Sequence, residues 1–126
     1  MVEDSSLHLT SLNGLPGPYI KYFEDQIGPL GIFRLLKDFE DKSAIAKCHI
    51  AIMDIKNEEK EIRIFDGFCE GQIVNPQGTQ IFGWDACFQP EGFDTSFSCL
   101  EKDVKNQISH RAKAFQKLAR YLNEMT

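Results

Sequence analysis

The sequence predicts a single α/β domain over residues 1–126, in which helices flank a mixed β-sheet. Residues 43–54 show a two-residue alternation, and residues 62–73 are rich in isoleucine and phenylalanine, both of which are typical of strands. Apolar residues recur at helical spacing near both ends of the chain. No internal repeat or linker divides the chain, so we expect one compact unit.

The N-terminal part begins with residues 2–9, which read as the end of a strand and the turn after it. Residues 13–18 are dense in glycine and proline and predict a loop. Apolar side chains then recur at helical spacing over residues 19–27, and a Gly-Pro pair follows that ends a helix. A second short helix is expected over residues 30–39.

The middle of the chain predicts an antiparallel hairpin, because a polar turn joins the strand at 43–54 to one or two strands over 62–73. Gly67 and Gly71 are expected to form bulges or bends there. Residues 82–89 are expected to be a strand or an extended segment.

The C-terminal part predicts a helix that Ser109 or Asn106 could cap. Its apolar residues follow a narrow stripe at spacings of four, three, four and three residues. The stripe consists of Ile108, Ala112, Phe115, Ala119 and Leu122.

Charge and composition exclude some classes of function. The net charge of −5 and the isoelectric point near 5.1 argue against generic nucleic-acid binding. No apolar run is long enough to cross a membrane, and no signal-peptide pattern opens the chain, so we expect a cytoplasmic protein without a membrane partner.

The four cysteines are expected to be reduced and mostly buried. A zinc site at Cys48, His49 and Cys69 is disfavoured because the usual ligand spacing is absent.

Two adjacent acids, Glu3 and Asp4, open the chain. Neighbouring strand residues point to opposite faces, so only one of the two is expected to enter any given cleft. A carboxylate at the end of a strand can hold Mg²⁺ through water or accept a proton from an attacking water. Two acids near a terminus are, however, also typical of a solvated surface.

An aromatic run and a group of donors suggest a site for a planar, polar heterocycle. Phe82 and Trp84 supply ring faces, Gly83 leaves room beside the backbone, and Asp85 needs a partner if it is buried. The alternative reading is that these aromatic rings are ordinary core.

The donors that follow are Lys105, Ser109, His110 and Arg111. Positive groups at a helix start oppose the macrodipole, so we expect a ligand or a carboxylate to compensate His110 and Arg111. The exposed lysines further along the helix are expected to be solvated.

Four segments together resemble the inosine triphosphate pyrophosphatase family: residues 2–7, 14–21, 82–90 and 105–111. The resemblance implies an elongated α/β fold with a cleft between two lobes. It implies hydrolysis of ITP, dITP and XTP to the monophosphate and pyrophosphate, with Mg²⁺ as cofactor, in a cytosolic homodimer. A carboxylate would activate the water that attacks the α-phosphorus.

The same resemblance implies roles for individual residues. Asp4 would be the catalytic carboxylate, and Glu3 and Asp4 would be metal ligands. Phe82 would stack on the purine, and the Ser-His-Arg triplet at 109–111 would read its edge. The substrate-binding set would be Ser5, Lys21, Phe82, Gly83, Trp84, Asp85, Lys105, Ser109, His110 and Arg111.

The resemblance stops short at the N-terminus. Family members begin with strands, a Thr-Gly-Asn-x-x-Lys phosphate loop and a metal-binding glutamate, and this chain carries none of them. We therefore expect the C-terminal majority of such a domain. A nucleotide-binding or dimer-forming remnant that is impaired in catalysis stays open as an alternative. A small structural adaptor with no ligand is a third reading.

Overall fold

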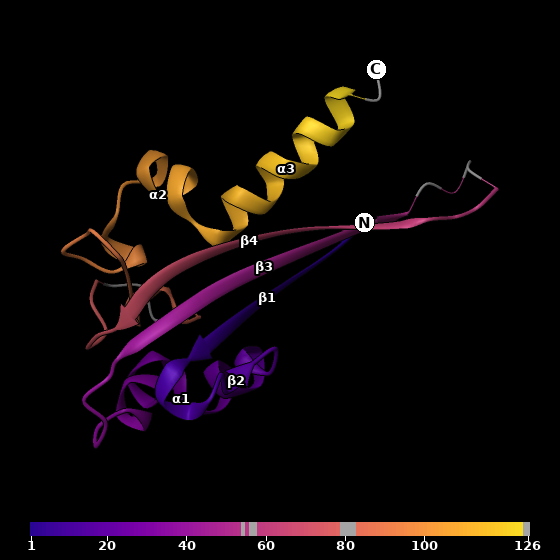
Figure 1. Cartoon of the computed structure of the whole chain (residues 1–126). Coiled ribbons are helices and arrows are strands. Elements are labelled where there is room, and N and C mark those ends of the chain that lie inside the picture. Colours follow the sequence, from indigo (N-terminus) through magenta and orange to yellow (C-terminus); the bar gives the residue numbers. More distant parts are fainter. Residues whose placement is uncertain (54, 56–57, 79–82, 125–126) are drawn as a thin grey trace.

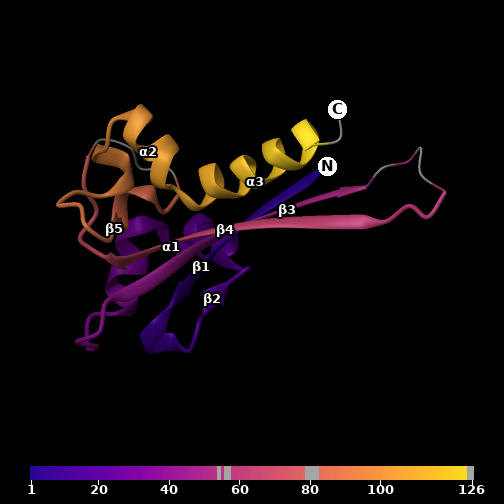
Figure 2. The same cartoon turned by 45° about the horizontal axis from the view of Figure 1, so that its top comes forward.

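A computed structural model describes residues 1–53, 55, 58–78 and 83–124 (Figure 1). Its five-stranded sheet has the order β2-β1-β3-β4-β5. The strands are β1 Val2–Leu9, β2 Pro16–Gly17, β3 Ser43–Met53, β4 Ile62–Ile73 and β5 Phe88–Pro90. The helix α1 lies beside β1 and β2, whereas α3 runs over β3 and β4, and the long β3–β4 hairpin projects past the helices (Figures 1 and 2).

Every pairing among these five strands is antiparallel, so the expectation of a mixed sheet was wrong. The reason lies in the connection between β1 and β3. The segment that joins β1 to β3 stays at the end of the sheet where β1 finishes. β3 starts at this same end, with its Ala44 opposite Leu9, the last residue of β1. A parallel neighbour would need a crossover back to the other end of the sheet.

The predicted hairpin is confirmed, with Ser43 opposite Gln72 and Met53 opposite Ile62. β4 is one continuous strand, so its glycines are not bulges. A Cβ at Gly67 would collide with the backbone of α3, and a Cβ at Gly71 would collide with the backbone of β5. Both glycines are therefore explained by the close approach of another backbone segment.

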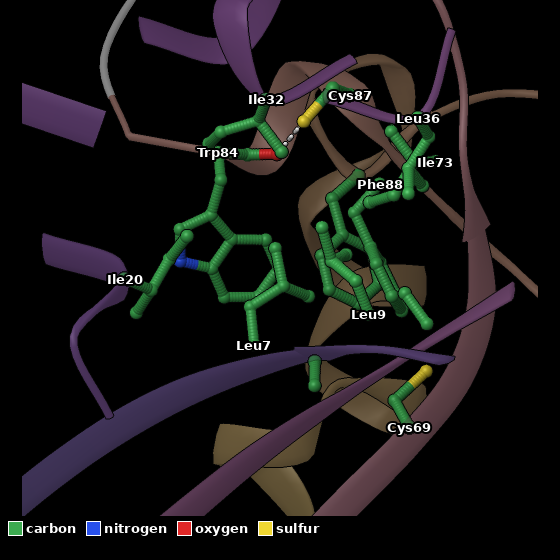
Figure 3. Packing of buried hydrophobic residues seen from close by; sticks show 13 residues of the cluster. Leu7, Leu9, Ile20, Ile32, Leu36, Cys69, Ile73, Trp84, Cys87 and Phe88 are labelled. Atoms are coloured by element: carbon green, nitrogen blue, oxygen red, sulfur yellow. Dashed lines mark hydrogen bonds between the residues drawn. The ribbon is translucent and has the colours of Figure 1, made fainter. Parts of the chain in front are cut away.

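Two hydrophobic clusters lie on one face of the sheet. In the larger one, Trp84 packs beside Leu7 of β1 and Ile20 of α1 (Figure 3). Phe88 and Phe97 complete its aromatic part, with ring centroids 4.9 Å apart. The smaller cluster joins β3 to α3 and contains Cys48, Ile50, Ala114 and Leu118.

The helix α1 spans Ile20–Leu35 and is broken at Gly28, whose φ of 67° is left-handed. The predicted break before Pro29 is therefore confirmed, but the second half ends before residue 39.

The predicted loop at 13–18 contains β2. In the region predicted as extended, Asp85–Cys87 forms a short 3₁₀ turn and only Phe88–Pro90 is a strand; Phe82 lies outside the described residues.

The C-terminal region forms two helices, α2 Lys102–Ile108 and α3 His110–Glu124. Ser109 has extended backbone angles, and its Oγ accepts a hydrogen bond from the Ala112 N–H at 3.1 Å. Ser109 is thus the N-terminal cap of α3, which was one of the two predicted caps.

The predicted apolar stripe, however, is not the buried face of α3. His110, Ala114 and Leu118 are buried, whereas Ala119 and Leu122 are exposed. The helix backbone rests directly on Gly67, and this close approach fixes which face meets the sheet.

The four thiols are free: three are buried and Cys99 is exposed, as expected for reduced cysteines. Within the part of the chain that the structure describes, no group of three or more His, Cys, Asp or Glu side chains is placed so that it could hold a metal ion. None of the described helices is long and apolar enough to cross a bilayer.

Candidate functional site

A cavity of about 920 Å³ lies between the segment at 83–85 and the helices α2 and α3, and β1 and α1 each contribute to its wall. Except for Lys21, every predicted substrate-binding residue that the structure describes lines this cavity. The lining residues are Ser5, Glu24, Gly83, Trp84, Asp85, Lys102, Lys105, Asn106, Ser109, His110, Arg111, Ala112, Phe115, Gln116 and Ala119. Tertiary contacts thus gather residues from opposite ends of the sequence.

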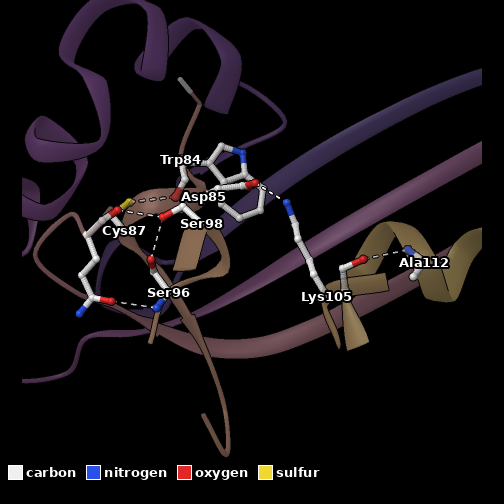
Figure 4. A network of polar contacts seen from close by, with 9 residues as sticks. Trp84, Asp85, Cys87, Ser96, Ser98, Lys105 and Ala112 are labelled. Carbon is white, nitrogen blue, oxygen red and sulfur yellow. Dashed lines mark hydrogen bonds and ion pairs between the residues drawn. The ribbon is translucent and has the colours of Figure 1, made fainter. Parts of the chain in front are cut away.

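Asp85 and Lys105 form an ion pair in this wall, with Nζ 2.5 Å from Oδ2 (Figure 4). Both side chains are about one-third exposed, at 29% and 33%. The Lys105 ammonium also lies 5.5 Å from the centre of the Phe97 ring. The prediction that Asp85 needs a partner is confirmed, and the pair leaves a carboxylate oxygen and further ammonium hydrogens for other contacts.

Trp84 holds this end of the cavity in place. Its side chain is only 7% exposed and contacts Phe88 edge-on at 5.6 Å and His110 at 5.3 Å between ring centroids. The reading of Trp84 as core is therefore confirmed, and the indole also lines the cavity. A rigid core residue here fixes the direction of the neighbouring Asp85.

His110 is 6% exposed and stacks on Phe97 with an interplanar angle of 12°. Burial lowers the pKa of His110 to about 4; the nearby charge of Asp85 opposes this shift and that of Lys105 adds to it. The ring is therefore neutral at pH 7, so His110 is not the cation that the helix-start argument assumed. Its Nδ1 is buried without a hydrogen-bond partner among the described residues. Such an atom is costly unless something binds it.

Arg111 has the carboxylate partner that its place at the helix start predicted. Its Nε donates to Oε1 of Glu3, and its Nη2 lies 3.3 Å from Oε2 of the same residue. The hydrogen bond to Glu3 raises the pKa of Arg111. The guanidinium also lies 4.9 Å from the centre of the Phe115 ring.

Glu3 and Asp4 lie on opposite faces of β1, as strand alternation predicts. Glu3 faces α3 through Arg111, whereas Asp4 is exposed beside His49 of β3 and does not line the cavity. One ion cannot be held by two carboxylates that point away from each other. The residues present therefore do not fit a metal site shared by Glu3 and Asp4.

Two predicted residues stand apart from the cavity wall. Lys21 is exposed on α1, one turn before Glu24, and its positive charge partly offsets the rise that burial causes in the pKa of the Glu24 carboxyl. Lys21 is therefore close to the rim without lining the cavity. Phe82, the predicted stacking ring, lies outside the described residues.

Sequence reasoning missed Glu24 as a site residue. Its Oε2 lies 3.5 Å from the position that a Cβ on Gly83 would occupy. Burial raises the pKa of Glu24, and the negative charges of Asp25 and Asp85 raise it further. A single acid on a helix carries no signal that could have identified it.

A second miss had a signal that was misread. Ala112, Phe115 and Ala119 belong to the predicted apolar stripe, and the structure places all three in the cavity wall. Phe115 also packs against the smaller cluster between β3 and α3. The cavity is thus polar on the side of α2 and partly apolar along α3, which suits a flat ligand with a polar edge.

The chain is similar to known proteins in sequence and in fold. Residues 1–121 match the model of the Ham1 family. Over 122 residues the chain is 47% identical to proteins named inosine triphosphate pyrophosphatase from two strains of Candida albicans, covering 97% of this chain and 59% of each relative. The chain therefore spans about three fifths of the length of these curated relatives.

Solved structures give the same picture. The Ham1 protein of Staphylococcus aureus is similar with a TM-score of 0.84 and 30% identity, over 98% of this chain and 66% of that one. A protein of Mycobacterium abscessus named nucleoside-triphosphatase or dITP/XTP pyrophosphatase is similar with a TM-score of 0.72 and 26% identity, over 93% and 62% of the two chains. The match across residues 1–121, together with the shared fold, means that this chain belongs to the Ham1 family.

Proposed function

We propose that this chain forms the base-binding part of an enzyme that hydrolyses the non-canonical purine nucleotides ITP, dITP and XTP to the monophosphate and pyrophosphate. One observation carries the proposal: His110, whose buried Nδ1 has no hydrogen-bond partner among the described residues, lines the same cavity as Arg111 and the Asp85–Lys105 pair. The names of the relatives in Candida albicans and Mycobacterium abscessus support it.

The chemistry of the purine edge explains the proposed choice of base. Hypoxanthine and xanthine carry a carbonyl oxygen at position 6, where adenine carries an amino group. Arg111 donates only, and the neutral His110 can donate from one ring nitrogen. The oxygen at position 6 would accept hydrogen bonds from both side chains. The amino group of adenine would instead face donors with donors, which costs about 1–3 kcal/mol of binding free energy for each unpaired group.

The other proposed contacts complete the nucleotide site. Phe82 would stack on the ring, with Gly83 leaving space for it and Trp84 bracing the wall behind. Ser5 and Lys21 would contact the sugar and phosphates, and Asp4 would activate water for attack at the α-phosphorus. No step is assigned to a metal ion, because Glu3 is paired with Arg111 and Asp4 lies on the opposite face of β1, so the two carboxylates do not converge on one ion.

A homodimer and a cytoplasmic location, both predicted from the resemblance, remain part of this proposal. They concern the whole protein and are testable by light scattering and by localisation of a tagged protein.

The test compares ITP, XTP, GTP and ATP as substrates, with and without Mg²⁺, and measures pyrophosphate release. We expect ITP and XTP to be hydrolysed and ATP to be left intact. Asp4→Ala should abolish turnover while Asp38→Ala, an exposed acid outside the cavity, should not. Equal turnover of ATP and ITP would refute the proposed selectivity, and an active Asp4→Ala protein would remove Asp4 from the mechanism.

The second candidate is a nucleotide-binding remnant without catalysis. The position of Asp4 outside the cavity favours it. It predicts that IMP binds while ITP is not hydrolysed under any condition of the same assay. A chain that neither binds IMP nor hydrolyses ITP would exclude both candidates.

A further inference from the structure

We infer that Glu3 is a positioning residue: it holds Arg111 in the orientation in which the guanidinium donates to the edge of an oxopurine in the cavity. The inference rests on the proposed function for its ligand. It assigns Glu3 a role in base recognition in place of metal binding.

The first support is the geometry of the pair. Glu3 meets Arg111 side-on, through Nε and Nη2, and joins β1 to α3 across 108 residues of sequence. A two-point contact of this kind fixes the plane of the guanidinium as well as its position. The Phe115 ring, 4.9 Å from the guanidinium carbon, supports it from α3.

The second support is what this contact leaves free. A guanidinium has five N–H donors, and the side-on contact uses two of them. The hydrogens on Nη1 and one on Nη2 remain available, and Arg111 lines the cavity. Glu3 thus leaves three N–H donors of Arg111 without a contact to its own carboxylate.

The third support is that Glu3 is itself held in place. Its side chain is only 26% exposed, whereas that of Arg111 is 61% exposed. The thiol of the buried Cys48 lies 3.8 Å from Oε1 of Glu3. The acid is therefore the more restrained member of the pair, and it can orient the more mobile cation.

A matched ion pair separates positioning from simple tethering. Lys117 of α3 reaches Asp66 of β4 with Nζ 3.3 Å from Oδ1, so it also ties α3 to the sheet. Neither residue lines the cavity. If Glu3 only held the helix down, loss of Asp66 should have the same consequences as loss of Glu3.

The first arm of the test observes Arg111 without any ligand, through its Nε–H signal in ¹⁵N-labelled protein. Arg111→Lys identifies the signal. We expect the Nε–H of Arg111 to be protected from solvent exchange in the wild-type chain and in Asp66→Asn, partly protected in Glu3→Asp, and unprotected in Glu3→Gln. An unprotected signal in the wild type, or an unchanged one in Glu3→Gln, overturns the inference.

The second arm measures the binding of IMP and AMP by calorimetry. Glu3→Gln should raise the Kd of IMP about tenfold and leave that of AMP nearly unchanged, as expected for one weakened charge-assisted hydrogen bond. Glu3→Asp should recover part of the affinity, and Asp66→Asn should leave both constants within about twofold.

The outcomes separate the two proposals. Tighter IMP binding by Glu3→Gln would mean that Glu3 competes with the ligand, and equal losses in Glu3→Gln and Asp66→Asn would mean tethering; either result overturns the inference. A wild-type chain that binds IMP no better than AMP refutes the proposed function and the recognition role of Glu3 together. In that case the Nε–H signal still decides whether Glu3 orients Arg111.

Discussion

The two ends of the cavity are built by different forces. At the closed end, Trp84 and His110 are almost fully buried and pack against the aromatic core. At the open end, Arg111 rests on Phe115 and is held by Glu3, with most of its side chain in solvent. Packing therefore orients the closed end whatever the ionic strength, whereas the open end depends on one ion pair that salt weakens.

The largest expected effect tests the packing of the closed end. Trp84→Ala should lower the free energy of unfolding by about 3–5 kcal/mol, because it leaves a cavity beside Phe88. Phe115→Ala, at the half-buried open end, should cost at most about half as much. Urea unfolding measures both values, and equal costs would mean that the two ends are packed alike.

The next effect depends on pH. The unfolded chain binds a proton on His110 near its ordinary pKa of 6.5, while the folded chain binds it only near pH 4. Acidification through this window therefore favours the unfolded state, and stability that is complete above pH 6.5 falls by about 3 kcal/mol as the pH drops to 4.

Unfolding measured from pH 4 to pH 7 checks this prediction. His110→Gln should flatten the profile, and the exposed His49→Gln should not. Burial also lowers the pKa of His8, so a smaller slope of the same sign should remain in both variants. A profile for His110→Gln as steep as that of the wild type would mean that His110 is not buried as a neutral ring.

A smaller effect is expected at the Asp85–Lys105 pair. Asp85→Asn removes the charge and keeps the shape of the side chain, so Lys105 loses its ionic partner. Both side chains are about one-third exposed, which limits the cost. We expect a loss of about 1 kcal/mol in unfolding free energy. Thermal unfolding at low salt and in 0.5 M NaCl would give the difference; a loss above that of Trp84→Ala would contradict the dominance of packing at this end.

The smallest effect is expected on the outer surface. Lys117 and Asp66 are both about half exposed, so Lys117→Ala should change the unfolding free energy by less than about 0.5 kcal/mol. Chemical denaturation can set an upper limit on a change in unfolding free energy of this size. A larger cost would mean that ion pairs, and not Gly67 and the small cluster beneath it, hold α3 on the sheet.

Local patterns predicted much of the fold. The alternation over 43–54 and the polar turn after it predicted the hairpin, and the Gly28-Pro29 pair predicted the break in α1. Ser109 was one of the two caps predicted for α3. These features depend on backbone preferences within a few residues. The apolar stripe of α3 did not predict its buried face, because a stripe does not say whether it meets a sheet or a cavity.

The candidate site divides in the same way. The order of residues along the chain by itself determined that donors, an acid and aromatic rings occur together near 83–85 and 105–111, since residue types and their spacing are visible in it. Only the tertiary structure decided that Glu3 pairs with Arg111, that Glu24 faces Gly83, and that His110 is neutral. Each of these follows from burial and from contacts between distant segments, which no local pattern contains.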